Sequence, residues 1–420
     1  MQSKQLLLFI GVVLLLAGCR KDEFLAPPVD TIKAFEFSFM NPYNGRSKPI
    51  YDLNDENFLT YYLTSNNTIE IKVIENNSFN ITQTKSYSAS TLFHNFYWGI
   101  SISKNLKQTS NDHFILTAIS ESNLDPINGS FYEYPTLHIC EFSSDGSLLN
   151  RDSLILPTAY TGVYSKPNVD FYNNFYYVGY LSNKYVGSSV ADSIHILKFD
   201  ANFNLVNQYS RIANSNPNVY DTEIIVNSEG IWFYYFDDYY YTDKIVFFED
   251  DGNSISQIFD KVSSVVEDPY YSFALNNIIK WDDKVTLMGV SYSPFGYTRA
   301  AFKSTNYNLT TLKNNRAEFL IDSTWNQNYT GYSFTNQNDL IIHYEEYLDR
   351  SIPGFAKFDL NGNKLLEVHL NLPDFSCYPV HVRDNYDGTF TLMGNKKVDG
   401  ADVWQAFVVI IDQQGKIIRR

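Results

Sequence analysis

One pattern recurs seven times along this chain of 420 residues: a short polar turn followed by a strand rich in aromatic and aliphatic residues. Two copies share the tetrapeptide TLMG, at residues 286–289 and 391–394. The equivalent apolar positions are 50 to 61 residues apart and comprise Phe58, Phe114, Phe175, Ile231, Val285, Leu340 and Phe390. A period of this length is typical of folds built from structural repeats. The repeat therefore limits the chain to architectures in which one unit is copied.

Each unit continues into a second pattern, in which a strand enters a tight turn and a further strand follows. Clear copies are CEFSSDGSLLN (140–150), LKFDANFNLVN (197–207) and AKFDLNGNKLL (356–366). Asn, Asp and Gly recur in these turns because they tolerate the positive φ angles of short hairpins. With the strand that precedes each polar turn, every unit holds four strands. The 33 Tyr and 31 Phe residues also favour strands over helices, so the chain is predicted to be all-β.

Antiparallel units of four strands at this period predict a β-propeller, in which neighbouring sheets bury their faces around a ring. Seven units predict seven blades, with six or eight as the alternatives. The units lack the Gly-His and Trp-Asp marks of WD40 blades and the Ser-x-Asp-x-Gly-x-x-Trp box of sialidases, so they identify no propeller family. We expect residues 34–39 (AFEFSF) to pair with the last unit and close the ring, and residues 415–420 (GKIIRR) to form its outermost strand.

The N-terminus carries a secretory signal. Lys4 precedes an apolar run at residues 6–16, and small residues lead to Cys19. Eleven apolar residues are too few to span a hydrocarbon layer of about 30 Å as a helix. The tetrapeptide Leu-Ala-Gly-Cys at residues 16–19 resembles the lipobox of bacterial lipoproteins. This resemblance implies that Cys19 is acylated and becomes the new N-terminus.

The residues after the cysteine suggest a destination. Lys21, Asp22 and Glu23 resemble the export signal of lipoproteins in Bacteroidota, a lysine followed by two acids. The resemblance covers only the first two dozen residues and implies the outer face of the outer membrane. A lipoprotein facing the periplasm is the alternative. The expected organisation is a signal peptide at 1–18, an acylated cysteine and tether at 19–33, and the propeller at 34–420.

Charge and motifs exclude several functions. The formal net charge is −15, whereas nucleic-acid binding needs clustered Lys and Arg, so no nucleic-acid partner is expected. The seven His residues show no ligand spacing, and no Gly-x-Ser-x-Gly elbow or phosphate loop is present. Residues 249–253 and 359–363 echo part of a calcium loop, but they coincide with the repeated hairpin turn, which explains them better. No metal or cofactor is predicted.

The longer connections predict where a ligand would bind. The turns joining strands 1–2 and 3–4 of each unit are short, while the links between strands 2–3 and between units are longer and aromatic, including residues 122–135, 236–243 and 345–354. Loops on a rigid scaffold are common binding sites, so the face carrying these links is the expected site. Tyr and Trp side chains could stack on sugars or grip a peptide. The candidate ligand-binding residues are Tyr240, Tyr270, Trp325 and Tyr347.

Carboxylates and thiols give weaker signals. Paired acids at Asp237-Asp238 and Glu345-Glu346 could perform glycoside chemistry across a channel, but we expect them to be solvated loop residues. Cys140 and Cys377 fall in units two and seven, with the first unit between them. Both are therefore expected to be free thiols.

These observations favour a binding module for a glycan, a peptide or a partner protein, anchored to the outer membrane by lipid and exposed at the cell surface. A polysaccharide-active enzyme of the glycoside hydrolase type is one alternative. A scaffold on the periplasmic side of the outer membrane is another. Acids converging at the centre of the ring would favour the enzyme, and an aromatic strip on the loop face would favour binding.

Overall fold

The structure is a computed structural model that describes most of the chain from residue 50 onward. The described ranges are 33–34, 50–54, 56–63, 68–76, 78–93, 99–102, 106–110, 113–121, 136–156, 167–186, 189–213, 222–237, 242–262, 272–292, 298–306, 308, 310–316, 326–347, 351–370, 377–397 and 404–418. The predicted signal peptide, Cys19 and the tripeptide Lys21, Asp22 and Glu23 lie outside these ranges. Within them, no helix is long and apolar enough to cross a membrane.

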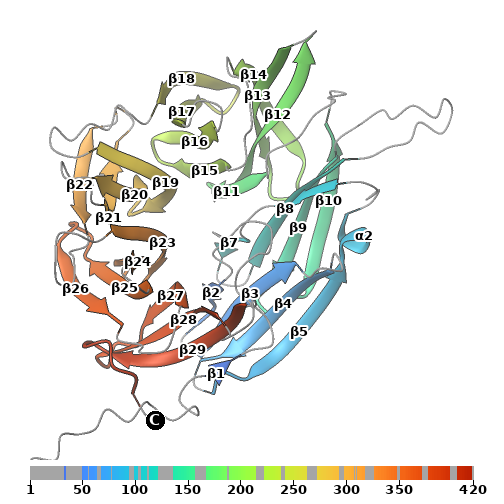
Figure 1. The fold of residues 1–420 in the computed structure, drawn as a ribbon. Helices are drawn as coiled ribbons and strands as arrows, with labels where there is room; N and C mark the ends of the chain where they lie inside the picture. The colour runs from blue at the N-terminus through green and yellow to red at the C-terminus, as the bar shows by residue number, and fades with distance from the viewer. Residues whose placement is uncertain are drawn as a thin grey trace, which may run out of the picture.

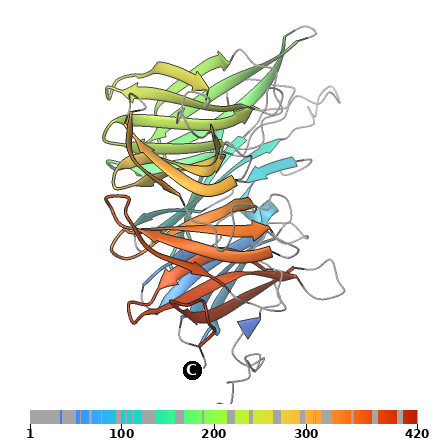
Figure 2. The same ribbon diagram turned by 60° about the vertical axis from the view of Figure 1, so that its left-hand side comes forward.

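Seven antiparallel sheets surround a common axis, so the predicted seven-bladed propeller is confirmed and rings of six or eight blades are excluded (Figure 1). Figure 2 shows the same ring from the side, with the blades following one another in chain order. Six blades have four strands, and blade 2 fills its innermost position with two short strands. Innermost strands of neighbouring blades contact each other at four of the junctions, namely those of blades 2 and 3, 3 and 4, 4 and 5, and 6 and 7, which places these strands around the axis.

The first three blades follow the predicted units. Blade 1 contains β2 (Ile50–Asp52), β3 (Asn57–Leu63), β4 (Thr68–Glu75) and β5 (Ile81–Ser88). Blade 2 contains β6 (Gly99–Ile102), β7 (Lys107–Ser110), β8 (His113–Glu121), β9 (Thr136–Ser143) and β10 (Leu148–Ile155). Blade 3 contains β11 (Asn168–Tyr172), β12 (Phe175–Val186), β13 (Ser189–Phe199) and β14 (Leu205–Ala213). A short helix, α2 (Ala89–Leu92), links blades 1 and 2 and is capped by Ser88, which accepts a hydrogen bond from the backbone N–H of Thr91 at 3.1 Å.

The remaining blades complete the ring. Blade 4 contains β15 (Thr222–Asn227), β16 (Gly230–Asp237), β17 (Thr242–Asp250) and β18 (Ile255–Val262). Blade 5 contains β19 (Ser272–Trp281), β20 (Lys284–Tyr292), β21 (Thr298–Thr305) and β22 (Thr311–Arg316). Blade 6 contains β23 (Asn326–Phe334), β24 (Leu340–Tyr347), β25 (Ser351–Phe358) and β26 (Lys364–His369). Blade 7 contains β27 (Cys377–Asp384), β28 (Thr389–Lys397), β29 (Trp404–Asp412) and the N-terminal strand β1 (Lys33–Ala34).

The core is divided into one cluster of buried apolar side chains for each seam between neighbouring blades, as defined by the described residues. At the seam between blades 3 and 4, a Cβ atom on Gly179 would lie 2.8 Å from the ring of Phe233, so only glycine lets the two sheets approach this closely. No single sheet could bury both of its faces alone. The ring is therefore held together by sequential packing of copies.

The 3–4 turns explain the recurring Asp and Asn residues. Asp200 accepts hydrogen bonds from the backbone N–H groups of Asn202 and Asn204 at 2.8 and 2.9 Å. Asp359 accepts equivalent bonds from Asn361 and Asn363 at 2.9 and 2.8 Å. These bonds confirm that the calcium-like sequence at residues 359–363 is a hairpin turn capped by its own aspartate.

Both chain ends close the ring at the outer edge of β29. Lys33 and Ala34 of β1 pair antiparallel with Val408 and Phe407. This confirms that the N-terminal segment pairs with the last blade at Ala34 and shows the pairing one residue earlier, at Lys33, while residues 35–39 of the predicted latch lie outside the described residues. Farther along the same edge, the backbone N–H of Ile418 donates to the carbonyl of Ile410 at 3.0 Å. The C-terminal segment thus forms only part of the outermost strand predicted for residues 415–420, because β1 occupies the rest of the edge (Figure 1).

Two of the predicted aromatic links are shorter than expected. Strands β16 and β24 run on through Asp237 and Tyr347, and their partners resume at Thr242 and Ser351. Four of the eight residues 236–243 and seven of the ten residues 345–354 therefore belong to strands, since aromatic and β-branched residues suit a pleated surface as well as a loop. The predicted link at 122–135 lies outside the described residues.

Candidate functional site

Blade 2 departs from the repeat at its innermost position. Strand β6 pairs with Ala118–Glu121 of β8, and β7 pairs with its start at His113–Ile115. Between these pairings the inner strand is interrupted, and the hydroxyl of Thr117 donates to the carbonyl of Pro167 in blade 3 at 3.2 Å. A local break in an otherwise regular repeat is where a functional site is most often found.

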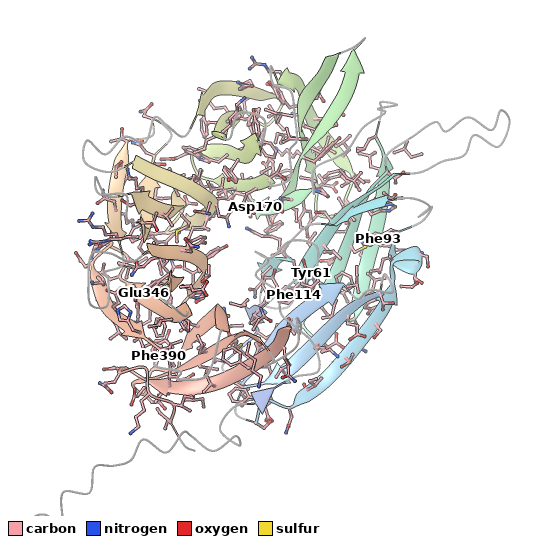
Figure 3. All side chains as sticks on the ribbon, in the orientation of Figure 1. Tyr61, Phe93, Phe114, Asp170, Glu346 and Phe390 are labelled. Carbon is pink, nitrogen blue, oxygen red and sulfur yellow. The ribbon has the colours of Figure 1, made fainter. Side chains whose placement is uncertain are left out.

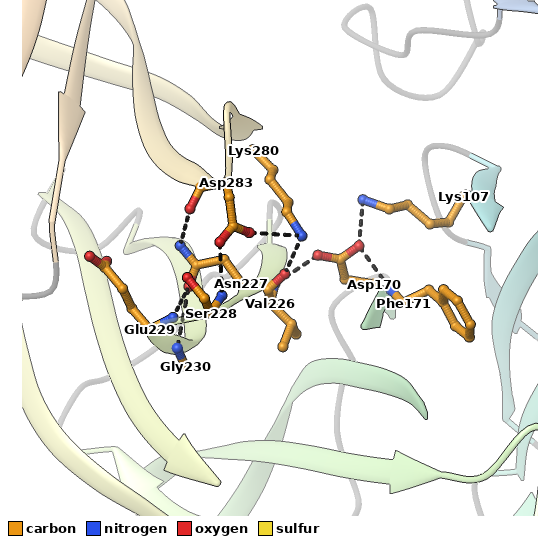
Figure 4. A network of polar contacts seen from close by, with 10 residues as sticks. All are labelled: Lys107, Asp170, Phe171, Val226, Asn227, Ser228, Glu229, Gly230, Lys280 and Asp283. Atoms are coloured by element: carbon orange, nitrogen blue, oxygen red, sulfur yellow. Dashed lines mark hydrogen bonds and ion pairs between the residues drawn. The ribbon is translucent and has the colours of Figure 1, made fainter. Parts of the chain in front are cut away.

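The interrupted strand places Lys107 against Asp170 on β11. The ammonium Nζ of Lys107 lies 2.6 Å from Oδ1 of Asp170, whose side chain is only 2% exposed. The backbone N–H of Phe171 also donates to Oδ1, at 2.8 Å, and that of Val226 in blade 4 donates to Oδ2 at 2.7 Å (Figure 4). Three donors therefore compensate the buried carboxylate. Figure 3 shows Asp170 at the inner edge of the ring.

Lys107 keeps its charge at neutral pH. Partial burial alone would lower the pKa of Lys107, but the charge of Asp170, their hydrogen bond and the charge of Glu223 outweigh it and raise that pKa. An ammonium group has three N–H donors, and Asp170 accepts from one of them. The Lys107 side chain is 34% exposed, so the group remains accessible from the ring interior.

Two tyrosines complete a cluster drawn from five blades. Burial raises the pKa of Tyr332 on β23, and the charges of Glu223 and Asp170 raise it further. Burial also raises the pKa of Tyr51 on β2, together with the neighbouring Tyr332 and Glu223 among others. Because such interactions weaken with distance, these side chains lie within electrostatic range of one another on the inner strands of the ring. We call Tyr51, Lys107, Asp170, Glu223 and Tyr332 the axial cluster.

A second polar network borders the axial cluster on the side of the 1–2 turns. Lys280 on β19 donates to the carbonyl of Val226 at 2.9 Å and lies 3.4 Å from Asp283. Its ammonium group also sits 4.9 Å from the ring centre of Tyr172. Asn227 donates to the carbonyl of Asp283 at 2.9 Å (Figure 4). These contacts join blades 3, 4 and 5 next to the axial cluster, on the side of the 1–2 turns.

The four aromatic residues predicted to bind ligand are not tested by this geometry. Tyr240, Tyr270 and Trp325 lie outside the described residues. Tyr347 is the last residue of β24, where it is paired with Asn326 and Ser351, and its side chain is also outside the description. They remain predictions. The sequence signal for the axial cluster was weak, because its members come from five units and share no motif.

The expectation that Glu345 and Glu346 are solvated loop residues is wrong. Both belong to β24, and their exposed fractions are 1% and 0%. Gln327 donates to Oε1 of Glu346 at 2.7 Å, and Nδ1 of His369 lies 3.6 Å from the same oxygen. Adjacent strand residues point to opposite faces, so the two acids enter two different seams. Asp237 likewise belongs to a strand, whereas Asp238 lies outside the described residues.

The described residues offer little support for a metal-binding site or a reactive cysteine. Within them, no group of three or more His, Cys, Asp or Glu side chains is arranged to hold a metal ion. Cys140 is a free, buried thiol, as expected, and burial raises its pKa to about 12. It is therefore a poor nucleophile at neutral pH. Cys377 begins β27, and its side chain is outside the description.

Comparison with known proteins does not place the chain in a family. The sequence matches no protein-family model and no curated protein. A protein of unknown function from Dyadobacter fermentans aligns at 9% identity over 91% of this chain and 100% of its own, with a TM-score of 0.39. An ulvan lyase of a polysaccharide lyase family aligns at 7% identity over 91% and 96%, with a TM-score of 0.48. An endo-arabinase from Bacteroides thetaiotaomicron aligns at 13% identity over 60% and 92%, with a TM-score of 0.32. Likenesses this distant carry no functional conclusion.

Proposed function

We propose that this chain is a lipoprotein exposed on the outer membrane, whose propeller binds a glycan, a peptide or a partner protein at the axial cluster without transforming it. One observation carries the binding role. An ion pair between blades 2 and 3, Lys107–Asp170 at 2.6 Å, lies on the inner strands within electrostatic range of polar side chains from three further blades, although ring packing requires only the apolar seams. Convergent polar groups held by a rigid scaffold are typical of ligand sites.

The protonation chemistry of the cluster favours binding over catalysis. A general acid or base works best with a pKa near the operating pH. Tyr51, Tyr332 and Lys107 all have pKa values raised away from neutrality, so each keeps its proton. Asp170 already accepts from three donors. Glycoside hydrolysis uses two carboxylates, and the carboxylate of Asp170 is already held by these three donors.

The proposed location at the outer membrane rests on the resemblance of residues 16–23 to lipoprotein signals. Each buried acyl CH₂ group contributes roughly 0.8 kcal/mol, so a multiply acylated Cys19 would hold the protein firmly in the membrane. In the sequence, the predicted tether at residues 19–33 ends at β1, which pairs with the outer edge of blade 7.

The proposed location at the cell surface is tested by protease treatment of intact cells. Cys19→Ala should release the protein from the membrane fraction. Replacing Lys21, Asp22 and Glu23 by Ala should leave it anchored but protected from added protease. Equal protease sensitivity with and without the tripeptide would remove the export signal, and full protection of the wild type would favour the periplasmic scaffold.

The binding role is tested with the full chain carrying Cys19→Ala, which lacks the anchor. Retardation in gels containing polysaccharide, or capture of a defined peptide or protein, should occur without release of reducing ends or unsaturated products. Product release that disappears in Glu223→Gln would show that the enzyme alternative is right.

A further inference from the structure

The face of the ring that carries the 1–2 and 3–4 turns holds a cleft at the seam between blades 1 and 2. Its volume is about 180 Å³. It is lined by the apolar side chains of Leu53 and Val73, the amides of Asn54, Asn57 and Gln83, and the carboxylate of Asp145. These residues come from the 1–2 turn and two outer strands of blade 1 and from the 3–4 turn of blade 2. None of them belongs to the axial cluster, so the cleft is a separate place on the ring.

Two other blades carry a lysine at the position that Val73 occupies in blade 1. Val73 is the last residue of β4 before the register with β5 shifts, and Lys198 and Lys357 hold that place in blades 3 and 6. Nζ of Lys198 lies 2.7 Å from Oδ2 of Asp250, at the 3–4 turn of blade 4, and its side chain is only 5% exposed. The ammonium group of this blade therefore bridges the seam to the next one.

The seam between blades 6 and 7 repeats this arrangement. Nζ of Lys357 lies 2.8 Å from Oδ2 of Asp384 in blade 7 and 3.0 Å from Oδ2 of Asp339 in its own blade. Asn57 is the counterpart of Asp339 in blade 1, because each immediately precedes the apolar position that repeats in every unit. Val73 and Asn57 both line the cleft. The cleft thus lies where the other two seams hold a lysine side chain.

Asp145 supplies a carboxylate that has no ion-pair partner among the described residues. It accepts hydrogen bonds from the hydroxyl of Ser143, and from the backbone N–H and hydroxyl of Ser147 at 3.0 and 2.8 Å. These bonds, that from Ser143 foremost, lower its pKa to about 2, and the charge of Lys85 contributes least to the shift. Asp145 is therefore ionised at neutral pH. A carboxylate has about four acceptor sites, so Oδ2 can accept one further donor.

Both walls of the cleft are held in place before any ligand binds. The hydroxyl of Tyr87 donates to the carbonyl of Gly146 at 2.8 Å and accepts from the backbone N–H of Leu148 at 3.0 Å, which ties the turn carrying Asp145 to blade 1. Gly146 has a φ of 77°, and a Cβ atom there would lie 2.8 Å from the side chain of Ile71. Opposite, Asn54 accepts from the backbone N–H groups two and three residues later, both at 2.8 Å. The site is preorganised.

We propose that this cleft binds the ammonium group of a lysine side chain presented by a partner protein or peptide. The partner's lysine takes the place that Lys198 and Lys357 fill at the other seams. The volume holds roughly six water molecules, which is enough for the four-carbon stem and the ammonium group of one lysine. This inference goes beyond the proposed binding at the axial cluster and does not depend on it.

The lining matches each part of a lysine side chain. Leu53 and Val73 offer apolar surface to the methylene stem, a contact that an amino sugar, which has no such stem, would not make. In the part of the chain that the structure describes, the side-chain amides of Asn57 and Gln83 form no hydrogen bond. Their oxygens and the carboxylate of Asp145 can accept the three N–H donors of an ammonium group. The formal net charge of −15 also attracts a basic partner and repels an acidic one.

The test uses the full chain carrying Cys19→Ala, with leucine and valine methyl groups labelled for NMR. The probes are the peptide acetyl-Gly-Lys-Gly-amide, its Nε-acetylated form, which keeps the stem and loses the charge, and chitotetraose as a source of ammonium groups without a stem. We expect the lysine peptide to shift the methyl signals of Leu53 and Val73 in a saturable manner. The acetylated peptide and chitotetraose should leave these signals unchanged.

Two variants test the role of the carboxylate. Asp145→Asn should weaken binding of the lysine peptide about tenfold, as expected for losing a hydrogen bond to a charged group. The matched control is Asp251→Asn in the 3–4 turn of blade 4. Asp251 accepts the same kinds of bond, from the backbone N–H groups of Asn253 and Ser254 and from the Ser254 hydroxyl. This control removes the same charge away from the cleft and should bind the peptide as the parent protein does.

A third variant tests the comparison between seams. Val73→Lys supplies the lysine from within, as blades 3 and 6 do, and should abolish the peptide-induced shift at Leu53 while the methyl signals of blades 3 to 6 stay in place. If this variant does not fold, the pair Asp145→Asn and Asp251→Asn decides the question.

The remaining outcomes overturn the inference. Unchanged Leu53 and Val73 signals with the lysine peptide, or equal shifts with its acetylated form, would show that the cleft does not bind an ammonium group. Unchanged affinity in Asp145→Asn would remove the carboxylate from the site. A response to chitotetraose without a response to the lysine peptide would replace the protein partner by an amino glycan. The proposed binding at the axial cluster is judged by its own experiment in each case.

Discussion

The seam between blades 2 and 3 and the seam between blades 7 and 1 both hold neighbouring blades together, but they differ in the size of their apolar cores and in their polar contacts. Counting described residues, the first buries twelve apolar side chains, and the second buries six. The first also carries the Lys107–Asp170 pair at its inner end. The second joins His381 to Asp52 at 3.0 Å, between residues 329 positions apart.

This difference shows where the ring is strong and where it is weak. Blades 2 and 3 follow one another in the chain, whereas closing blade 7 onto blade 1 requires a loop of more than 300 residues and costs more chain entropy. The smaller core of the closing seam is supplemented by β1, which adds a strand across the ring junction. The ring thus places its candidate site at a well-packed seam and its weakest junction elsewhere.

The largest effect on stability is expected from a deletion that removes the closing seam. Deleting residues 385–420 eliminates β28 and β29 and exposes apolar faces on blades 6 and 1. Because each blade is stabilised only by its neighbours, we expect insoluble or protease-labile protein rather than a ring of six blades. Limited proteolysis with mass spectrometry checks this result. A stable fragment of the intact protein ending near residue 210 or 280 would instead indicate two independent domains.

Truncating one large side chain in each seam compares their cores directly. Phe199 at the seam of blades 2 and 3 and Phe58 at the closing seam are 2% and 0% exposed. Each Phe→Ala change should cost about 3–5 kcal/mol of unfolding free energy, and we expect Phe199→Ala to be the costlier because its crowded seam can collapse less around the cavity. Urea unfolding measures both. A larger loss for Phe58→Ala would mean that the closing seam is the better packed.

Removing the latch affects the closing seam alone. In protein produced without the predicted acyl anchor, deletion of residues 19–34 removes β1, whereas the matched deletion of 19–32 retains it. Losing about two backbone hydrogen bonds should lower the unfolding free energy by about 1–3 kcal/mol. Hydrogen exchange should accelerate at β29 and stay unchanged in blade 3. Equal exchange in the two deletions would show that the C-terminal segment closes the ring by itself.

The propeller architecture was predictable because every copy of the repeat carries the same turn and strand pattern. Seven polar turns and seven hairpins specify blades and strands, and the local chemistry of turns such as Asp359 needs no tertiary information. Strand ends were less predictable. The tyrosines and acids at residues 344–347 suit either a loop or a pleated strand, and only packing between blades places Glu345 and Glu346 in the interior.

The axial cluster could not be predicted from the sequence. Its members lie on the innermost strands of five repeats, at different positions along those strands and with different chemistry, so no spacing relates Lys107 to Glu223 or Tyr332. The sequence offered only an indirect indication of the site: at residues 103–112, polar residues interrupt the apolar strand pattern of the second unit. Recognising that irregularity identifies the blade, but only ring geometry brings Asp170 to the lysine.

The smallest expected effect concerns pH, because the two seams hold their histidines differently. His381 at the closing seam has a carboxylate partner, Asp52, whereas His195 in blade 3 lies 2.7 Å from the hydroxyl of Ser182 and stacks on Tyr180. Burial lowers the pKa of His195 from 6.5 to about 4. Below pH 6.5 the unfolded chain therefore binds a proton that the folded chain rejects, and stability falls as pH falls towards 4. Between pH 7 and pH 5.5 this residue should remove about 1 kcal/mol.

His195→Gln isolates that contribution. At pH 8 the imidazole is neutral in both states, so any difference from the wild type there measures packing and hydrogen bonding alone. Urea unfolding at pH 8 and pH 5.5 should show the wild type losing about 1 kcal/mol more than the variant over that interval. If both proteins lose stability equally, His195 is not held neutral in the fold, and the acid sensitivity must come from other groups.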